Sequence, residues 1–133
     1  MTLFEKIQAT ILIPKSTWHL IKVRRELKVR PYLEVLDKPI SKSKKRFALI
    51  VIVKSYFWSA RLLPNCNCLP RSIALYQKLK SMGYAVHHRF GVLKSAPKDK
   101  FSAHAWVDLD GESLNETKNL NQFVVLKKSN ENQ

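Results

Sequence analysis

The chain has 133 residues, 45% of them hydrophobic, so it can form one domain with a buried core and lacks the composition of a disordered protein. Its formal net charge is +14, which favours acidic partners such as a peptide, a nucleic acid or an anionic membrane surface. The cysteines, Cys66 and Cys68, are one residue apart. A disulfide between them would close a small strained ring, which argues against a disulfide-built secreted domain.

The N-terminus shows no signal peptide, because Glu5 interrupts it before a long apolar segment can form. The longest apolar run, from Phe47 to Val53, is far too short to cross a bilayer. We therefore expect a cytoplasmic protein with no membrane span.

The first half of the chain is expected to be helical. Apolar residues recur at helical spacing over residues 3–12, until Pro14 interrupts the pattern, and a second amphipathic helix follows over residues 18–27. Residues 31–39 have no clear pattern. The apolar segment 47–60 has β-branched residues that favour a strand, but its length without Gly or Pro favours a buried helix, and a helix is our prediction.

The second half begins with a loop over residues 62–67, and the apolar spacing predicts a helix that starts at Cys68. Pro70 lies in its first turn, where a missing N–H has no cost, and Gly83 stands at the position of a C-terminal cap. A tight hairpin is predicted at Asp110-Gly111. Strands are expected over residues 85–93, 103–109 and 122–126.

Taken together, these elements predict one α+β domain over residues 1–133. Residues 1–60 form a basic helical half, with 13 Lys and Arg against 4 Asp and Glu. Residues 61–133, with 11 against 6, form the half that carries the chemistry: a cysteine-bearing helix packed on a small antiparallel sheet. The charge of the helical half suggests that it docks an acidic partner surface.

Two residues in this order suggest a nucleophilic enzyme: Cys68 at a helix start and His104 on a strand. The unpaired N–H groups and positive dipole end of a helix favour a thiolate, and they can also stabilise an oxyanion. A neighbouring imidazole accepts the thiol proton and later donates it to the leaving group. Papain-like and transglutaminase-like folds combine a cysteine helix with a histidine-bearing antiparallel sheet in this way.

Two motifs carry a closer resemblance. Cys68-Leu-Pro-Arg-Ser-Ile-Ala-Leu and the downstream Phe101-Ser-Ala-His-Ala-Trp-Val-Asp-Leu-Asp-Gly resemble the lasso-peptide B2 proteins over about residues 45–117. These are transglutaminase-like cysteine peptidases that remove the leader from a ribosomal precursor peptide. The resemblance implies a Cys68 nucleophile and a His104 base. It also implies the stand-alone form of the family, because the chain has no room for a fused leader-binding domain.

The residue that orients His104 is where the sequence departs from this family. The family places an acid, usually Asp, twelve residues after the histidine, and Glu116 stands there. The hairpin register bears on the choice. A two-residue loop puts Asn115 opposite Trp106 on the His104 side, whereas a three-residue loop puts Glu116 there. We predict Glu116 as the third catalytic residue, with Asn115 as the alternative.

Other residues near the motif have less specific patterns. Arg71 and Trp106 are candidate substrate contacts. A surface charge would account for Arg71 equally well, and Trp106 has either a core position, which is the commoner case, or a position that shields His104. Asp108 is on the same face as His104 but two strand steps away, too far to orient it easily, and suits a solvated or structural role. Zinc would need ligands from Cys66, Cys68, His87, His88 and His104, but Cys-x-Cys is not a usual structural pairing and no second cysteine pair exists, so we expect no metal.

The resemblance implies that the chain cleaves a precursor peptide at the junction between leader and core, without a cofactor. Its implied partners are that precursor, a separate leader-binding protein and an ATP-using lasso cyclase that takes the freed core amine. Acyl transfer to an amine would use the same residues as hydrolysis. The alternative is a basic nucleic-acid-binding protein without enzymatic activity, which the charge suggests but no motif supports, so DNA is not an expected partner.

Overall fold

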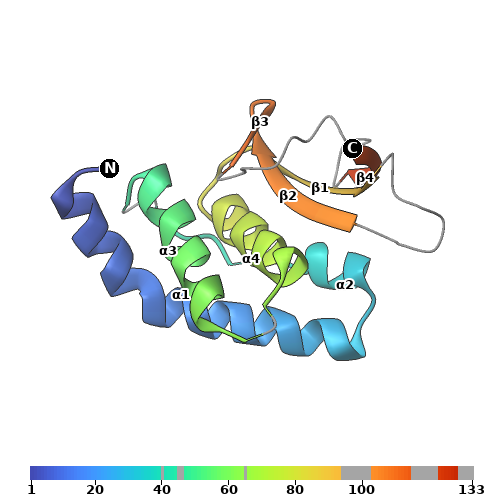
Figure 1. Ribbon diagram of the computed structural model, residues 1–133, viewed down its shortest axis with the longest axis horizontal. Coiled ribbons are helices and arrows are strands. Elements are labelled where there is room, and N and C mark those ends of the chain that lie inside the picture. Colours follow the sequence, from blue (N-terminus) through green and yellow to red (C-terminus); the bar gives the residue numbers. More distant parts are fainter. Residues whose placement is uncertain (40, 45–46, 65, 94–102, 115–122, 129–133) are drawn as a thin grey trace.

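The computed structural model describes residues 1–39, 41–44, 47–64, 66–93, 103–114 and 123–128. Helix α4 (Cys68–Ser81) lies in the middle of the fold, with the other helices on one side and a small sheet on the other (Figure 1). This helix matches the prediction: Pro70 is in its first turn, and Gly83 follows its end with a φ of +90°, a backbone conformation that suits glycine.

Helix α1 (Leu3–Val29) begins with a capping box between Thr2 and Glu5 and continues through Pro14. The predicted break at Pro14 is therefore wrong. A proline inside a helix costs about 3 kcal/mol in isolation, but its ring here lies on the exposed side. Residues on both sides of it are buried on one face against α3 (Leu49–Leu62), so tertiary packing outweighs the local cost.

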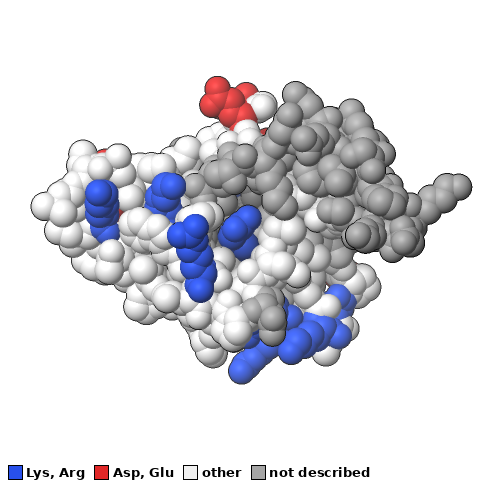
Figure 2. All heavy atoms as spheres, viewed as in Figure 1, with Lys and Arg blue, Asp and Glu red and all other residues white. Residues whose placement is uncertain are grey.

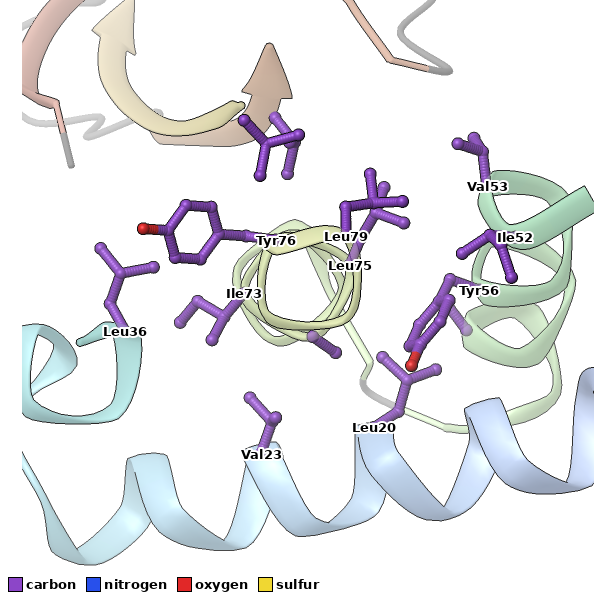
Figure 3. Packing of buried hydrophobic residues seen from close by; sticks show 14 of the residues in the cluster. Leu20, Val23, Leu36, Ile52, Val53, Tyr56, Ile73, Leu75, Tyr76 and Leu79 are labelled. Carbon is purple, nitrogen blue, oxygen red and sulfur yellow. The ribbon is translucent and has the colours of Figure 1, made fainter. Parts of the chain in front are cut away.

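Helix α3 confirms the choice of helix over strand for residues 47–60. The segment between the two longest N-terminal helices, which had no clear pattern, contains a short helix α2 (Tyr32–Leu36). Figure 3 shows α4 from along its axis, with α1 below it, α2 and α3 to its sides and the strands above. Because other elements surround it, α4 buries side chains in several directions, although its last turn carries lysines. The large apolar ones among them are Ile73, Leu75, Tyr76 and Leu79.

The sheet has four strands in the order β3-β2-β1-β4, and the described pairings are all antiparallel. The strands are β1 (Val86–Leu93), β2 (Ala103–Leu109), β3 (Glu112–Ser113) and β4 (Phe123–Lys128). The predicted strands are thus confirmed, with the last one ending two residues later than expected. A helical region beside a small antiparallel sheet, with Cys68 on the helix between them, is the predicted α+β arrangement.

The hairpin between β2 and β3 falls at Asp110-Gly111, as predicted, and of the two loop lengths considered it has the two-residue one. Asp110 and Gly111 both have positive φ angles, and Leu109 pairs with Glu112. Such turns match the twist of the strands that they join. The pairing of the two hairpin strands continues in this register to Leu114, whose N–H donates to the carbonyl of Val107.

Among the described residues, the helices are all too short or too polar to cross a bilayer.

Candidate active site

Cys68 is the first residue of α4, and the sequence before it explains why the helix starts there. The side chain of Asn67 caps the helix by accepting a hydrogen bond from the N–H of Leu69 at 3.2 Å. Pro70 then occupies the first turn, where its fixed φ suits a helix. The thiol consequently lies at the positive end of a 14-residue helix.

The thiol of Cys68 is more acidic than an ordinary cysteine. Burial raises its pKa, but hydrogen bonds from the His104 imidazole and from the backbone N–H of Ala105 lower it, as do the charges of His104 and Arg71. The balance leaves the pKa of Cys68 below its usual value. The structure therefore brings Cys68 and His104 into direct contact, in surroundings that favour a thiolate.

Cys66 provides a comparison within the same loop. Burial raises the pKa of its thiol, and the charges of Arg24 and Arg71 offset this only in part. Two cysteines one residue apart thus have opposite pKa shifts. The pKa shifts differ because the thiol of Cys68 is hydrogen-bonded by His104 and by the backbone N–H of Ala105, both in β2.

His104 is the second residue of β2 and is buried. Trp106, two residues along the same strand, stacks on the imidazole with ring centroids 5.8 Å apart and planes 22° apart. Trp106 is buried too, so it both packs in the interior and covers the histidine. The residue opposite His104 on β1 is Gly91, which has no side chain to crowd the imidazole.

Asp108 has the structural role expected for it. It is buried near the end of β2, where its carboxylate forms an ion pair with Arg89 of β1. An acid paired in this way is held away from His104, which lies four residues earlier on the strand. Asp108 is therefore not the group that orients the imidazole.

Arg71 lies one turn beyond Cys68, with its guanidinium 5.7 Å from the centre of the Phe57 ring. Together with Trp106 and Leu114 it lines a small hollow between α3, α4 and β2, with a volume of about 20 Å³. That is room for about one water molecule. The two candidate substrate contacts thus share one hollow close to the Cys68–His104 pair, although it is too small to hold a side chain without movement.

Asn115 and Glu116, the two candidates for the residue that orients His104, lie outside the described residues. The observed hairpin has a two-residue loop. In the sequence analysis, that loop length is the one that puts Asn115, and not Glu116, on the His104 side of the sheet. The prediction of Glu116 is neither supported nor contradicted by a contact. Both remain candidates.

The sequence did not predict the hydrogen bonds made by His88. Its imidazole is fully buried, with Nδ1 2.7 Å from the hydroxyl of Tyr32 and Nε2 2.8 Å from the hydroxyl of Ser72. Ser72 also donates to the carbonyl of Leu69, next to Cys68. His88 thus links α2 and β1 to the first turn of α4. Its position two residues after the apolar Val86 could have indicated an inward side chain.

These contacts determine the tautomer of His88. If Ser72 donates to Leu69, the imidazole N–H of His88 must be on Nε2, and Tyr32 must donate to Nδ1. Burial lowers the pKa of His88 to about 3, so the imidazole is neutral at physiological pH. His88 is therefore a fixed neutral link and not a second base.

Within the part of the chain that the structure describes, no three His, Cys, Asp or Glu side chains are grouped so that they could hold a metal ion. Of the residues considered for zinc, Cys68 and His104 contact each other, whereas the imidazole nitrogens of His88 are engaged by Tyr32 and Ser72.

A helix-borne cysteine beside a strand-borne histidine is the arrangement of a known group of proteins. A family model described as the transglutaminase-like superfamily matches residues 20–128. The chain therefore belongs to the transglutaminase-like superfamily, which includes cysteine peptidases. Neither the curated proteins nor the solved structures gave a significant match.

Proposed function

We propose that this protein is a cysteine peptidase that removes the leader from a ribosomally made lasso-precursor peptide. The observation that carries the proposal is the contact between Cys68 and His104 at the start of α4, where the pKa of the thiol is lowered. Family membership supports the reaction class, and the two motifs around these residues support the substrate class.

In the proposed reaction, the Cys68 thiolate attacks the carbonyl carbon at the junction between leader and core. His104, which holds the thiol proton, gives it to the departing amine of the core as the C–N bond breaks. The leader remains as a thioester on Cys68. Water then attacks the thioester while His104 takes its proton, which releases the leader acid and restores the thiol.

The helix start also offers a donor for the oxyanion. The N–H of Leu69 is taken by Asn67, and Pro70 has none, so the backbone N–H of Cys68 is the candidate from this turn. Glu116, or alternatively Asn115, would orient the imidazole as the third member of the triad.

The remaining assignments rest on the resemblance. Arg71 and Trp106 would contact the precursor, a separate leader-binding protein would present it, and a lasso cyclase would take the freed amine. The peptidase step needs no cofactor, because nucleophile, base and proton donor are all side chains of this chain. These partners place the proposed reaction in the cytoplasm.

The proposal is tested by incubating the protein with a precursor and its leader-binding partner and following leader release by mass spectrometry. Cleavage in water labelled with ¹⁸O should put one heavy oxygen on the leader carboxylate, whereas transfer to an added amine should produce a leader amide. Absence of both products, together with tight binding of a nucleic acid, would favour the non-enzymatic alternative.

The end of α1 is the proposed docking surface for the acidic partner. Figure 2 shows Lys and Arg side chains gathered along the lower edge of the molecule, over the last turns of this helix. Arg25, Lys28 and Arg30 are exposed there. Arg24 differs from them, because its guanidinium donates to the carbonyl of Pro64 at 2.7 Å and so holds the loop before Cys68.

Changing Arg25, Lys28 and Arg30 together to Gln should raise KM for the precursor–partner complex several-fold at low salt and leave kcat nearly unchanged. Exposed charges act over about 10 Å at 0.1 M salt, so the difference in KM should shrink at higher ionic strength. Steady-state kinetics at low and high salt measure this. Arg24→Gln is the comparison and should change kcat as well. A triple variant that lost kcat at constant KM would contradict the docking role.

A further inference from the structure

A second hollow lies away from the candidate active site, between α1, α3, the C-terminal part of α4 and the two residues Lys44 and Phe47. Its volume is about 220 Å³. Lys78, which lines it, comes ten residues after Cys68, about 15 Å along the helix axis. The hollow is therefore distinct from the Cys68–His104 pair.

Three of the lysines that the structure describes line this hollow: Lys15 from α1, Lys44 from the segment before α3, and Lys78 from α4. No acidic residue is among the described residues that line it. Burial, and then the nearby charge of Lys15, lower the pKa of Lys78. Neighbouring ammonium groups repel one another, and an anion bound among them would offset that repulsion.

Half of the other described residues that line the hollow are apolar. Leu12, Phe47, Ile52 and Met82 contribute hydrocarbon surface beside the lysines. Apolar surface does not stabilise a hydrated inorganic ion, whereas a ligand with a hydrocarbon part would bury that part against it. Charge and surface together therefore indicate an anion attached to an apolar body.

Two polar residues of the lining, His19 and Tyr56, are held in place by hydrogen bonds. His19 is held at both ring nitrogens, by the Tyr56 hydroxyl at 2.6 Å and by Oε1 of Gln77 at 2.8 Å. The amide of Gln77 is itself oriented, because its nitrogen donates to the carbonyl of Val35. This places the imidazole proton on Nε2 and leaves Tyr56 as the donor to Nδ1. This part of the lining is thus preorganised, which reduces the entropic cost of binding.

We propose that this hollow is a binding site for a carboxylate carried on an apolar group, with Lys15, Lys44 and Lys78 around the anion and Leu12, Phe47 and Met82 around the hydrocarbon. The same chemistry occurs in a free alkyl carboxylate and in a peptide with an acidic residue beside apolar ones. Tyr56 lines both this hollow and the small hollow beside Trp106. An occupant of the larger hollow would therefore contact a side chain that also borders the small one.

Methionine provides a specific probe. The chain has two methionines, Met1 at the exposed start and Met82 in the wall of the hollow. With ¹³C-methyl-methionine in the full-length protein, octanoate and an acetylated Leu-Glu-Leu amide should each be titrated, with octanol as the uncharged control. Octanoate or the peptide should shift the Met82 methyl resonance, assigned with a Met82→Leu variant, and leave that of Met1 in place.

The double variant Lys15→Gln/Lys78→Gln should weaken this binding by about tenfold or more, because it removes two of the lysine charges proposed to hold the anion. Lys22→Gln, on the same helix as Lys15 but outside the lining, should not weaken it. Binding of octanoate alone would identify a free carboxylate as the ligand, and binding of the peptide alone would identify a chain segment.

The inference is overturned if neither probe shifts Met82, if octanol binds as tightly as octanoate, or if the double variant binds unchanged. A circular dichroism spectrum like that of the unaltered protein verifies that the variants are folded.

Discussion

Replacing Cys68 by Ala should lower the rate of leader release by about 10³-fold or more, because no other group in the proposed reaction can form the thioester. Cys66→Ala should retain most of the activity, since the pKa of its thiol is raised and it has no part in the contact between Cys68 and His104. Single-turnover cleavage of the precursor, followed by mass spectrometry, measures both rates.

Thiol alkylation gives an independent measure of the same difference. Iodoacetamide at neutral pH should modify Cys68 well before Cys66, since the reactive species is the thiolate and, of these two thiols, only that of Cys68 has a lowered pKa. The precursor–partner complex should protect Cys68. Retained cleavage by Cys68→Ala, or loss of cleavage in Cys66→Ala alone, would rule out the proposed nucleophile.

Acid should destabilise the protein through His88. The pKa of His88 is about 3 in the fold and about 6.5 in an unfolded chain, so folding favours the neutral imidazole. Its contribution is complete above about pH 6.5 and is lost as the pH falls towards about 3. Between about pH 7.5 and about pH 5 the loss amounts to about 2 kcal/mol of unfolding free energy. Urea unfolding at a series of pH values measures it.

His88→Gln should flatten this pH dependence, and His87→Gln, the neighbouring substitution on the other face of β1, should leave it unchanged. Burial also lowers the pKa of His19, so a smaller dependence should remain in His88→Gln. If His88→Gln does not fold, NMR of the unaltered protein still decides the point. An imidazole of His88 that becomes charged near its ordinary pKa of about 6.5 in the folded protein would contradict the prediction.

His88→Gln should also affect the candidate active site, because His88 is linked by hydrogen bonds to the turn that carries Cys68. His88 reaches Ser72, and Ser72 donates to the carbonyl of Leu69, so the link ends one residue from the thiol. His88 is therefore a positioning residue for the turn that carries Cys68. We expect the loss of this link to disturb the cysteine turn even where the fold survives.

Local sequence determined much of the second half of the chain. Pro70 and Gly83 mark the two ends of the cysteine helix, because the first suits a helix start and the second suits a positive φ. Asp110-Gly111 similarly indicated where the hairpin turns, and the structure then showed that the loop has two residues. Each of these features depends on a few neighbouring residues, so no knowledge of the rest of the fold was needed.

The first half shows where local reasoning fails. Pro14 indicated a break, but packing on α3 keeps α1 continuous, and that packing joins residues far apart in the chain, such as Ser16 and Ser55. Residues 31–39 gave no clear signal, and α2 forms there with Val35 and Leu36 buried in the common core. In both cases the stabilising contacts come from other elements.

The candidate site divides in the same way. Residue types and spacing selected Cys68 and His104, since a nucleophile at a helix start and a base on a strand are visible in the chain itself. Only the tertiary structure showed that the Ala105 N–H and Arg71 also act on the thiol, that Asp108 pairs with Arg89, and that His88 is a buried link. These contacts depend on distances and burial across the fold, which the order of residues along the chain does not specify.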